Sequence, residues 1–156
     1  MPQLMQEMAI VLATLAQADI DMSPFQFRCL ARNIYHEARG EDIDGQIAVA
    51  QVTMNRVMSE KYPDTICEVV REDRGPKPWD CQFSWWCNGK PNTPTDFEAY
   101  QLAAIVAAEV IKGEPEDYVG GALHYVAESA MDRGWVRNMT VYGQIGRHVF
   151  LISEEG

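Results

Sequence analysis

Basic side chains are scarce in this sequence. Its 156 residues contain 13 Lys and Arg against 23 Asp and Glu, which gives a formal net charge of −10. A protein that binds duplex nucleic acid neutralises phosphates with clustered basic residues, and no segment here concentrates them. The sequence also lacks a run of about 18 uninterrupted apolar residues, the length that a membrane-spanning helix needs. We therefore expect neither a nucleic-acid partner nor a membrane span.

Metal-binding motifs are also missing. His36-Glu37 begins an H-E-x-x-H zinc motif, but position 40 is Gly, so the second histidine is absent. The other two histidines, His124 and His148, stand in no recognisable ligand spacing. We expect hydrogen-bonded histidines, no metal and no cofactor.

The four cysteines match no zinc-ribbon or C-x-x-C redox motif. Cys29 lies on a helical apolar stripe, where a buried free thiol is one interpretation. Cys67, Cys81 and Cys87 flank or lie in an irregular segment that a disulfide would stiffen, which favours work outside a reducing cytosol. The pairing cannot be read from the sequence. A nucleophilic cysteine assisted by His124 is a further alternative without a local signature.

The first 22 residues are predicted to form an amphipathic helix. Residues 8–16 imitate a signal peptide, but residues 1–7 contain no Lys or Arg and do contain Glu7. Apolar residues recur here at helical spacing, namely Leu4, Met5, Met8, Leu12 and Leu15. We expect residues 1–22 to be retained and to pack on a domain formed by residues 23–156, which we expect to be a monomer.

Two further helices are predicted in the first half of that domain. One begins at Ser23, a typical N-cap followed by Pro24, and is ended by Gly40. The next runs from Asp44 to about Glu60, with a buried side made of Ile47, Ala50, Met54, Val57 and Met58.

The remaining elements define the fold class. A capping box at Thr95 opens a third helix, which continues to a glycine at position 113. Residues 122–126 and 141–152 are rich in β-branched and aromatic side chains and predict short strands, with Gly143 and Gly146 at turns or bulges. The fold class is therefore α+β, mostly helical, with a small hairpin or sheet near the C-terminus.

Residues 71–95 are rich in proline and glycine and predict a long irregular loop, a kind of segment that is often functional. The loop holds an aromatic group among amide and hydroxyl side chains, with Trp79, Phe83, Trp85 and Trp86 beside Gln82, Ser84, Asn88 and Asn92. Aromatic faces with polar partners suit a sugar ring. The alternative is a hydrophobic cluster that anchors the loop.

Glu37 is the strongest candidate for catalysis. It follows Ile34 by three residues and Leu30 by seven, so it shares a helix face with residues that point to the core. Burial and the negative end of the helix dipole both raise the pKa of such a carboxyl group, as a general acid requires. The alternative is that Arg39 or Arg32 simply pairs with Glu37.

Five segments carry a resemblance to a known family, in the right order and with compatible gaps: Cys29–Val57, Tyr62–Cys67, Cys81–Trp85, Gly120–Tyr125 and Ile145–Phe150. Over about residues 27–151 the sequence resembles the SleB/CwlJ-type cell-wall hydrolases. The resemblance implies a lysozyme-like lytic transglycosylase domain that acts on peptidoglycan strands between N-acetylmuramic acid and N-acetylglucosamine. It assigns the general acid to Glu37 and substrate binding to Gln46, Asn55, Gln82, Phe83, Ser84, Trp85 and Tyr125.

A lytic transglycosylase needs no second carboxylate, since the muramic acid 6-hydroxyl itself closes an anhydro ring. The acids that follow Glu37, which are Glu41, Asp42 and Asp44, look solvated. The alternatives are a hydrolysing muramidase that uses Glu37 and water, and a catalytically silent glycan-binding module. The resemblance places the protein at the cell wall, in the periplasm or outside the cell. Departures from the spore enzymes of that family, among them the four cysteines, favour a compact phage-type lysin or a small bacterial wall hydrolase.

Overall fold

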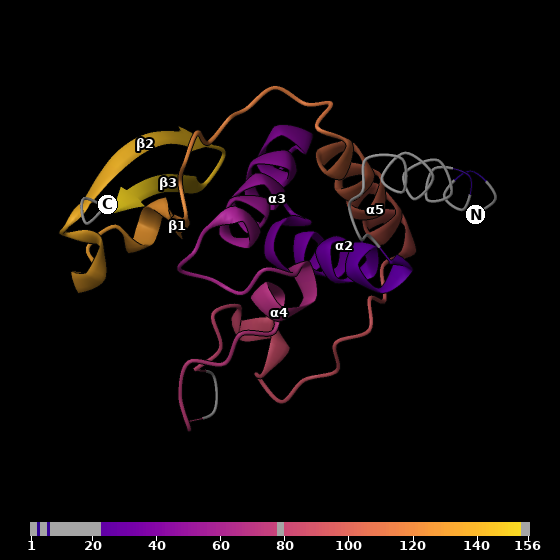
Figure 1. Ribbon diagram of the computed structural model, residues 1–156, viewed down its shortest axis with the longest axis horizontal. Coiled ribbons are helices and arrows are strands. Elements are labelled where there is room, and N and C mark those ends of the chain that lie inside the picture. Colours follow the sequence, from indigo (N-terminus) through magenta and orange to yellow (C-terminus); the bar gives the residue numbers. More distant parts are fainter. Residues whose placement is uncertain (1–2, 4–5, 7–22, 78–79, 154–156) are drawn as a thin grey trace.

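The computed structural model describes Gln3, Gln6, residues 23–77 and residues 80–153. The predicted helix over residues 1–22 therefore lies outside the described residues, apart from Gln3 and Gln6. The described helices are α2 (Pro24–Ala38), α3 (Ile43–Met58), α4 (Ile66–Val70) and α5 (Phe97–Lys112), and the strands are β1 (His124–Ala127), β2 (Met139–Ile145) and β3 (His148–Ser153) (Figure 1). Short 3-10 turns are η1 (Ser84–Trp86), η2 (Glu128–Ala130) and η3 (Gly134–Val136).

Helix α2 begins as its sequence predicts. The Ser23 hydroxyl accepts a hydrogen bond from the Gln26 backbone N–H at 3.4 Å, and Pro24 occupies the first turn. Its end differs from the prediction, because the helix ends at Ala38 and Gly40 has no left-handed φ. Gly40 instead leaves room for the Arg147 side chain, since a Cβ at position 40 would lie 3.2 Å from the Arg147 guanidinium.

Helix α3 is shorter than predicted, and its buried face is partly different. Met58 is 83% exposed, so its predicted burial is wrong. Ala50 is buried, and the face around it carries Val49, Val52 and Thr53. This face is wide because α3 packs on α2 and α5 on one side and on the sheet on the other.

The start of α5 corrects the predicted capping box. Asp96, rather than Thr95, is the N-cap, and its Oδ1 accepts a hydrogen bond from the Ala99 N–H at 3.1 Å. The backbone N–H groups of Thr95 and Asp96 both donate to the Tyr35 hydroxyl on α2, which fixes the start of α5 against that helix. Gly113 ends α5 with a φ of 73°, as predicted.

The strands form one antiparallel sheet in the order β1-β3-β2, which lies beside the helices and near the C-terminal end (Figure 1). The ladder between β2 and β3 shifts between Val141 and Gly143, and Gly146 turns the chain with a φ of 58°. Both glycines thus mark irregular positions as predicted. The α+β fold class, mostly helical with a small C-terminal sheet, is confirmed.

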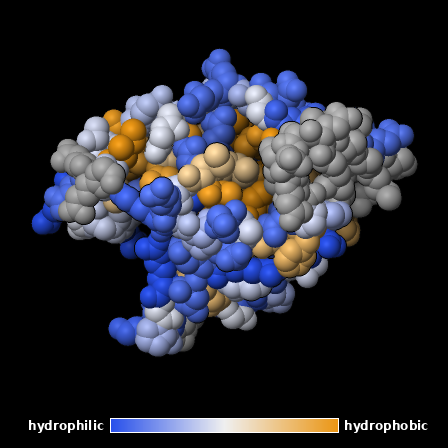
Figure 2. Space-filling view, viewed as in Figure 1, coloured by the Kyte–Doolittle hydropathy of each residue, from blue (hydrophilic) through white to orange (hydrophobic). Residues whose placement is uncertain are grey.

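Two of the three clusters of buried side chains among the described residues hold these layers together, and the third lies within the sheet region. The larger lies among α2, α4, α5 and η1 and includes Leu30 and Ile34. The smaller joins α3 to the sheet through Val52 and Phe150. Figure 2 shows hydrophilic side chains over α4 and the loop that follows it, and an outline that is indented between this region and the sheet. Among the residues described, no helix combines the length and the apolar character needed to cross a bilayer.

Candidate active site

Glu37 lies in the last turn of α2, where the helix approaches β1. Because Leu30 and Ile34 occupy the core below it, the side chain of Glu37 is directed between helix and sheet and is only partly exposed. The Tyr125 hydroxyl, which comes from β1, donates a short hydrogen bond to Glu37 Oε1. The edge-to-face contact of Tyr125 with His148, whose ring centroids lie 5.0 Å apart, fixes the tyrosine ring from β3.

Burial raises the pKa of Glu37 because it disfavours the charged carboxylate. The hydrogen bond from Tyr125 and the positive charge of Arg56 oppose this effect, but the pKa remains above its ordinary value. Arg39 does not pair with Glu37, since its guanidinium lies over the Tyr35 ring, 4.6 Å from the centroid. The site therefore holds a carboxyl group that stays protonated to higher pH than an exposed glutamate.

Arg56 is a component of the site that the sequence analysis missed. It is 3% exposed, its Nε donates to the Leu123 carbonyl at 2.8 Å, and its guanidinium lies between the rings of Tyr62 and Phe83. A signal was present in the sequence, because Arg56 falls on the apolar α3 stripe seven residues after Val49.

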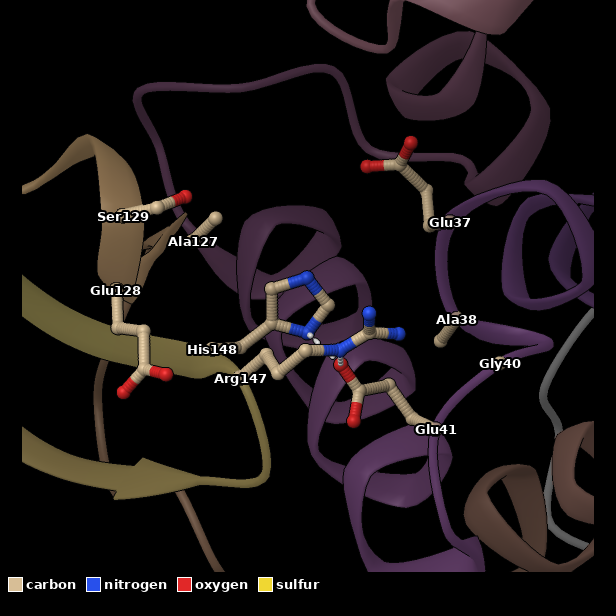
Figure 3. Close-up of a pocket in the computed structure, with 9 residues that line it drawn as sticks. All are labelled: Glu37, Ala38, Gly40, Glu41, Ala127, Glu128, Ser129, Arg147 and His148. Carbon is tan, nitrogen blue, oxygen red and sulfur yellow. Dashed lines mark hydrogen bonds and ion pairs between the residues drawn. The ribbon is translucent and has the colours of Figure 1, made fainter.

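A first pocket of about 280 Å³ lies on the sheet side of Glu37. In Figure 3 the Glu37 carboxyl group comes from α2 on one side and Ala127 and Ser129 lie on the other. His148, Arg147 and Glu41 lie below them, joined by dashed lines at Glu41.

The expectation that Glu41 is solvated is wrong. Its side chain is 8% exposed, and Oε1 lies 3.4 Å from Arg147 Nε and 3.7 Å from His148 Nδ1. The β2–β3 turn closes over it, and a Cβ on Gly146 would meet Glu41 Oε2, at a position whose left-handed φ also favours glycine. Asp42 and Asp44 are exposed, as expected.

A second pocket of about 550 Å³ lies on the loop side of Glu37, between the end of α2 and residues 84–95. Ser84 and Trp85, both predicted to bind substrate, line it together with His36 and Glu37. Glu37 thus lines both pockets.

The aromatic loop is anchored by its buried members. Trp85 is buried, its Nε1–H donates to Asn33 Oδ1 at 2.8 Å, and its ring stacks on His36 at 4.3 Å between centroids. Phe83 is buried beneath Arg56. Trp79 lies outside the described residues. The alternative of an anchoring cluster therefore applies to Phe83 and Trp85, while Trp85 also lines the pocket.

Three other predicted site residues have structural hydrogen bonds instead. Asn55 Nδ2 donates to the carbonyls of Gly120 and Ala122 at 2.8 and 2.9 Å, which holds the entry to β1 against α3. Gln46 is buried, and its Nε2 donates to the Glu41 carbonyl. Gln82 is partly buried at the start of the aromatic loop, where its N–H donates to the Glu72 carbonyl. None of these three lines either pocket.

The cysteines form two disulfides, Cys29–Cys67 and Cys81–Cys87. Cys29 is therefore not a free thiol, and the first bond ties α2 to α4. The second closes a short loop around η1. In residues 23–77 and 80–153, no group of three His, Cys, Asp or Glu side chains is arranged so that it could hold a metal ion.

A glutamate whose pKa is raised by burial and which lines two pockets has the properties that the general acid of a glycosidase requires. The model of the Cell Wall Hydrolase family matches residues 40–151, and this chain belongs to that family. The family match begins after Glu37 and does not include it. The case for Glu37 as a functional residue therefore depends on its burial, its hydrogen bond and the pockets described above.

Relatives of this chain include the spore cortex-lytic enzyme of Oceanobacillus iheyensis, which is 33% identical over 121 residues, or 78% of this chain and 39% of that protein. The spore cortex-lytic enzyme of Bacillus cereus is 31% identical over 122 residues, or 78% of this chain and 42% of that protein. The chain thus spans about two fifths of the length of these relatives.

Solved structures with the same fold are the catalytic domain of the Bacillus cereus SleB protein and the catalytic domain of the germination-specific lytic transglycosylase SleB from Bacillus anthracis. The first has a TM-score of 0.64 at 30% identity and covers 84% of this chain and 92% of its own. The second has a TM-score of 0.63 at 29% identity and covers 85% and 98%.

Proposed function

We propose that this chain cleaves peptidoglycan strands between N-acetylmuramic acid and N-acetylglucosamine as a lytic transglycosylase, with Glu37 as general acid and then base. One observation carries the proposal: Glu37, whose pKa burial raises, lines both pockets. A glycan strand that lies across both pockets would place a glycosidic bond beside this carboxyl group. Membership of the Cell Wall Hydrolase family and the likeness to a lytic transglycosylase domain support it.

In the first step, protonated Glu37 donates its proton to the glycosidic oxygen as the bond to muramic acid C1 breaks. Tyr125 engages Oε1 of Glu37, so Oε2 is the oxygen that is left for the substrate. The same Tyr125 hydrogen bond stabilises the carboxylate that remains when the proton has left.

In the second step, the Glu37 carboxylate accepts the proton of the muramic acid 6-hydroxyl while that oxygen bonds to C1. The products are a 1,6-anhydromuramic acid end and a free 4-hydroxyl on N-acetylglucosamine, and Glu37 is protonated again. Atoms and charge balance without water or a second carboxylate.

The hydrolysing muramidase has one observation in its favour, because the buried Glu41 lines the first pocket together with Glu37. An inverting or retaining glycosidase needs such a second carboxylate across the scissile bond. Glu41, however, already faces Arg147 and His148, which engage its Oε1. We propose that Glu41 in this arrangement shapes the wall of the pocket, and the Glu41→Gln variant tests whether it also acts on water.

The proposed place of action is the cell wall, in the periplasm or outside the cell, as for a phage-type lysin. Two disulfides in a chain of this size agree with work in an oxidising compartment, because cytosolic thiols are usually kept reduced.

Digestion of purified peptidoglycan followed by mass spectrometry of the released muropeptides tests these proposals. Anhydro ends, lighter by one water than reducing ends, are expected from the wild-type protein. Glu37→Gln removes the proton donor and should lower the rate by at least about 100-fold, whereas the matched control Glu114→Gln, at an exposed position, should not. Reducing ends that disappear in Glu41→Gln would establish the muramidase, and no release at all would establish the silent binding module.

A further inference from the structure

A line of arginines follows one face of α2. Arg28, Arg32 and Arg39 are separated by four and seven residues, which places their side chains within about 40° of one another around the helix axis. Arg71, at the end of α4, lines a pocket of about 170 Å³ together with Arg28 and Arg32. These four residues, the arginine ridge, are a concentration of positive charge in a chain with a net charge of −10.

Within the described part of the chain, no carboxylate forms an ion pair with the arginine ridge. The carboxylates that lie beside Arg71 have other partners, since Glu68 accepts a hydrogen bond from the Thr65 hydroxyl and Glu72 pairs with Arg74 at 3.0 Å. Among the described residues, Arg28, Arg32 and Arg39 thus have no ion-pair partner, while Glu68 and Glu72 lie near Arg71.

Aromatic rings hold two members of the ridge in place. Arg71 lies over the rings of Phe25 and Trp86, 4.8 and 4.7 Å from their centroids, and Arg39 lies over Tyr35. Stacking uses the flat face of a guanidinium group and leaves its N–H donors, which lie in the plane, free to bind a carboxylate with two hydrogen bonds.

The local electrostatics agree with this geometry. Burial lowers the pKa of His36, and the positive charges of Arg39 and Arg32 lower it further. The two arginines on either side of His36 thus contribute to its lowered pKa, and their charges make the field along this face of α2 positive although the protein as a whole is acidic.

The ridge meets the active site at Arg39, whereas Arg28, Arg32 and Arg71 line a separate pocket. Arg39 and His36 line the second pocket together with Glu37, and Arg32 stands one turn of α2 before His36. Groups that project from a glycan strand in that pocket toward the start of α2 would meet the ridge.

We propose that the arginine ridge binds the carboxylates of the stem peptides that hang from the muramic acid residues of the substrate. This inference rests on the proposed function and adds a substrate requirement to it. The glycan backbone supplies hydroxyl and acetamido groups, while the stem peptides carry the carboxylates that match a row of guanidinium groups. An enzyme with a net negative charge would thus meet an anionic wall with a positively charged face.

Binding assays can separate this role from catalysis. The Glu37→Gln protein is sedimented with peptidoglycan that has been stripped of teichoic acids, and in parallel with glycan strands from which an amidase has removed the peptides. Adding Arg28→Gln and Arg32→Gln should weaken binding to intact peptidoglycan by about tenfold, with a steeper loss at low salt. The same pair should leave binding to peptide-free strands unchanged.

The matched control is Arg133→Gln with Arg137→Gln, which removes the same charge from exposed positions near the sheet. Equal weakening by the control pair, or equal weakening on peptide-free strands, would overturn the inference. Replacing Arg28 and Arg32 by Lys keeps the charge and removes paired hydrogen bonding, so intermediate binding is expected. Failure of the proposed function gives a different result, in which the wild-type protein releases no muropeptide from either substrate.

Discussion

Replacing Tyr125 with Phe removes one hydroxyl and nothing else from the site. That hydroxyl donates to Glu37 Oε1, and it is one of two groups that hold the pKa of Glu37 down against the effect of burial. Its loss should therefore raise the pKa of Glu37 further. Because a general acid works only while protonated, activity falls as pH rises through this pKa, and the Tyr125→Phe enzyme should keep its activity to higher pH.

The size of the effect follows from the hydrogen bond. A neutral donor bonded to a charged acceptor contributes about 1.5–3 kcal/mol, and about 1.4 kcal/mol corresponds to one pKa unit. Glu37 partly faces a pocket, which favours the lower value. We expect the alkaline limb of kcat/KM to move upward by about one pH unit. The maximal rate should be lower, because the Glu37 carboxylate in the second step no longer accepts the hydrogen bond from Tyr125.

The assay is the initial rate of muropeptide release from purified peptidoglycan over a series of pH values. Tyr142→Phe is the matched control, since Tyr142 is exposed on β2 and does not contact Glu37. It should leave the profile in place. An alkaline limb that stays fixed, or moves to lower pH, in Tyr125→Phe would refute the assignment of that limb to Glu37 and Tyr125.

Two other predictions concern stability. The Cys29–Cys67 disulfide joins residues 38 positions apart, so replacing both cysteines with Ala should lower the free energy of unfolding by about 4 kcal/mol. Replacing Cys81 and Cys87, which are 6 positions apart, should lower it by about 2 kcal/mol. Denaturant titration measures both losses, and equal losses would contradict the dependence on loop length. Gly146→Ala forces a left-handed φ on alanine and drives its Cβ into Glu41, so it should cost about 2 kcal/mol or more, whereas Gly113→Ala, with open space around it, should cost about 1 kcal/mol. Thermal unfolding that ranks them in the opposite order would show that Glu41 is not confined by the turn.

Local patterns in the sequence predict the helical part of the site well. Glu37 shares a stripe with Leu30 and Ile34, and both the helix and the partial burial of the side chain follow from that spacing. Arg56 carries the same kind of signal on α3, where a charged residue stands on an apolar stripe. Met58 satisfies the same pattern but extends past the packed part of its helix, so it is exposed.

The surroundings of Glu41 depend on residues more than a hundred positions away. Arg147 and His148 reach it only because β3 pairs with β2 and returns the chain to the end of α2. The same holds for Tyr125, whose contact with Glu37 requires the sheet to pack on the helices. A periodic pattern describes one element, and it carries no information on which distant element covers it.

The two rims of the groove around Glu37 differ in how they are secured. Both disulfides lie on the loop side, where they fix α4 and the segment around η1. The described part of the sheet side contains no cysteine and is held by Asn55 and by apolar contacts. On reduction, therefore, the loop rim loses its covalent fastenings, while the described contacts of the sheet rim all remain.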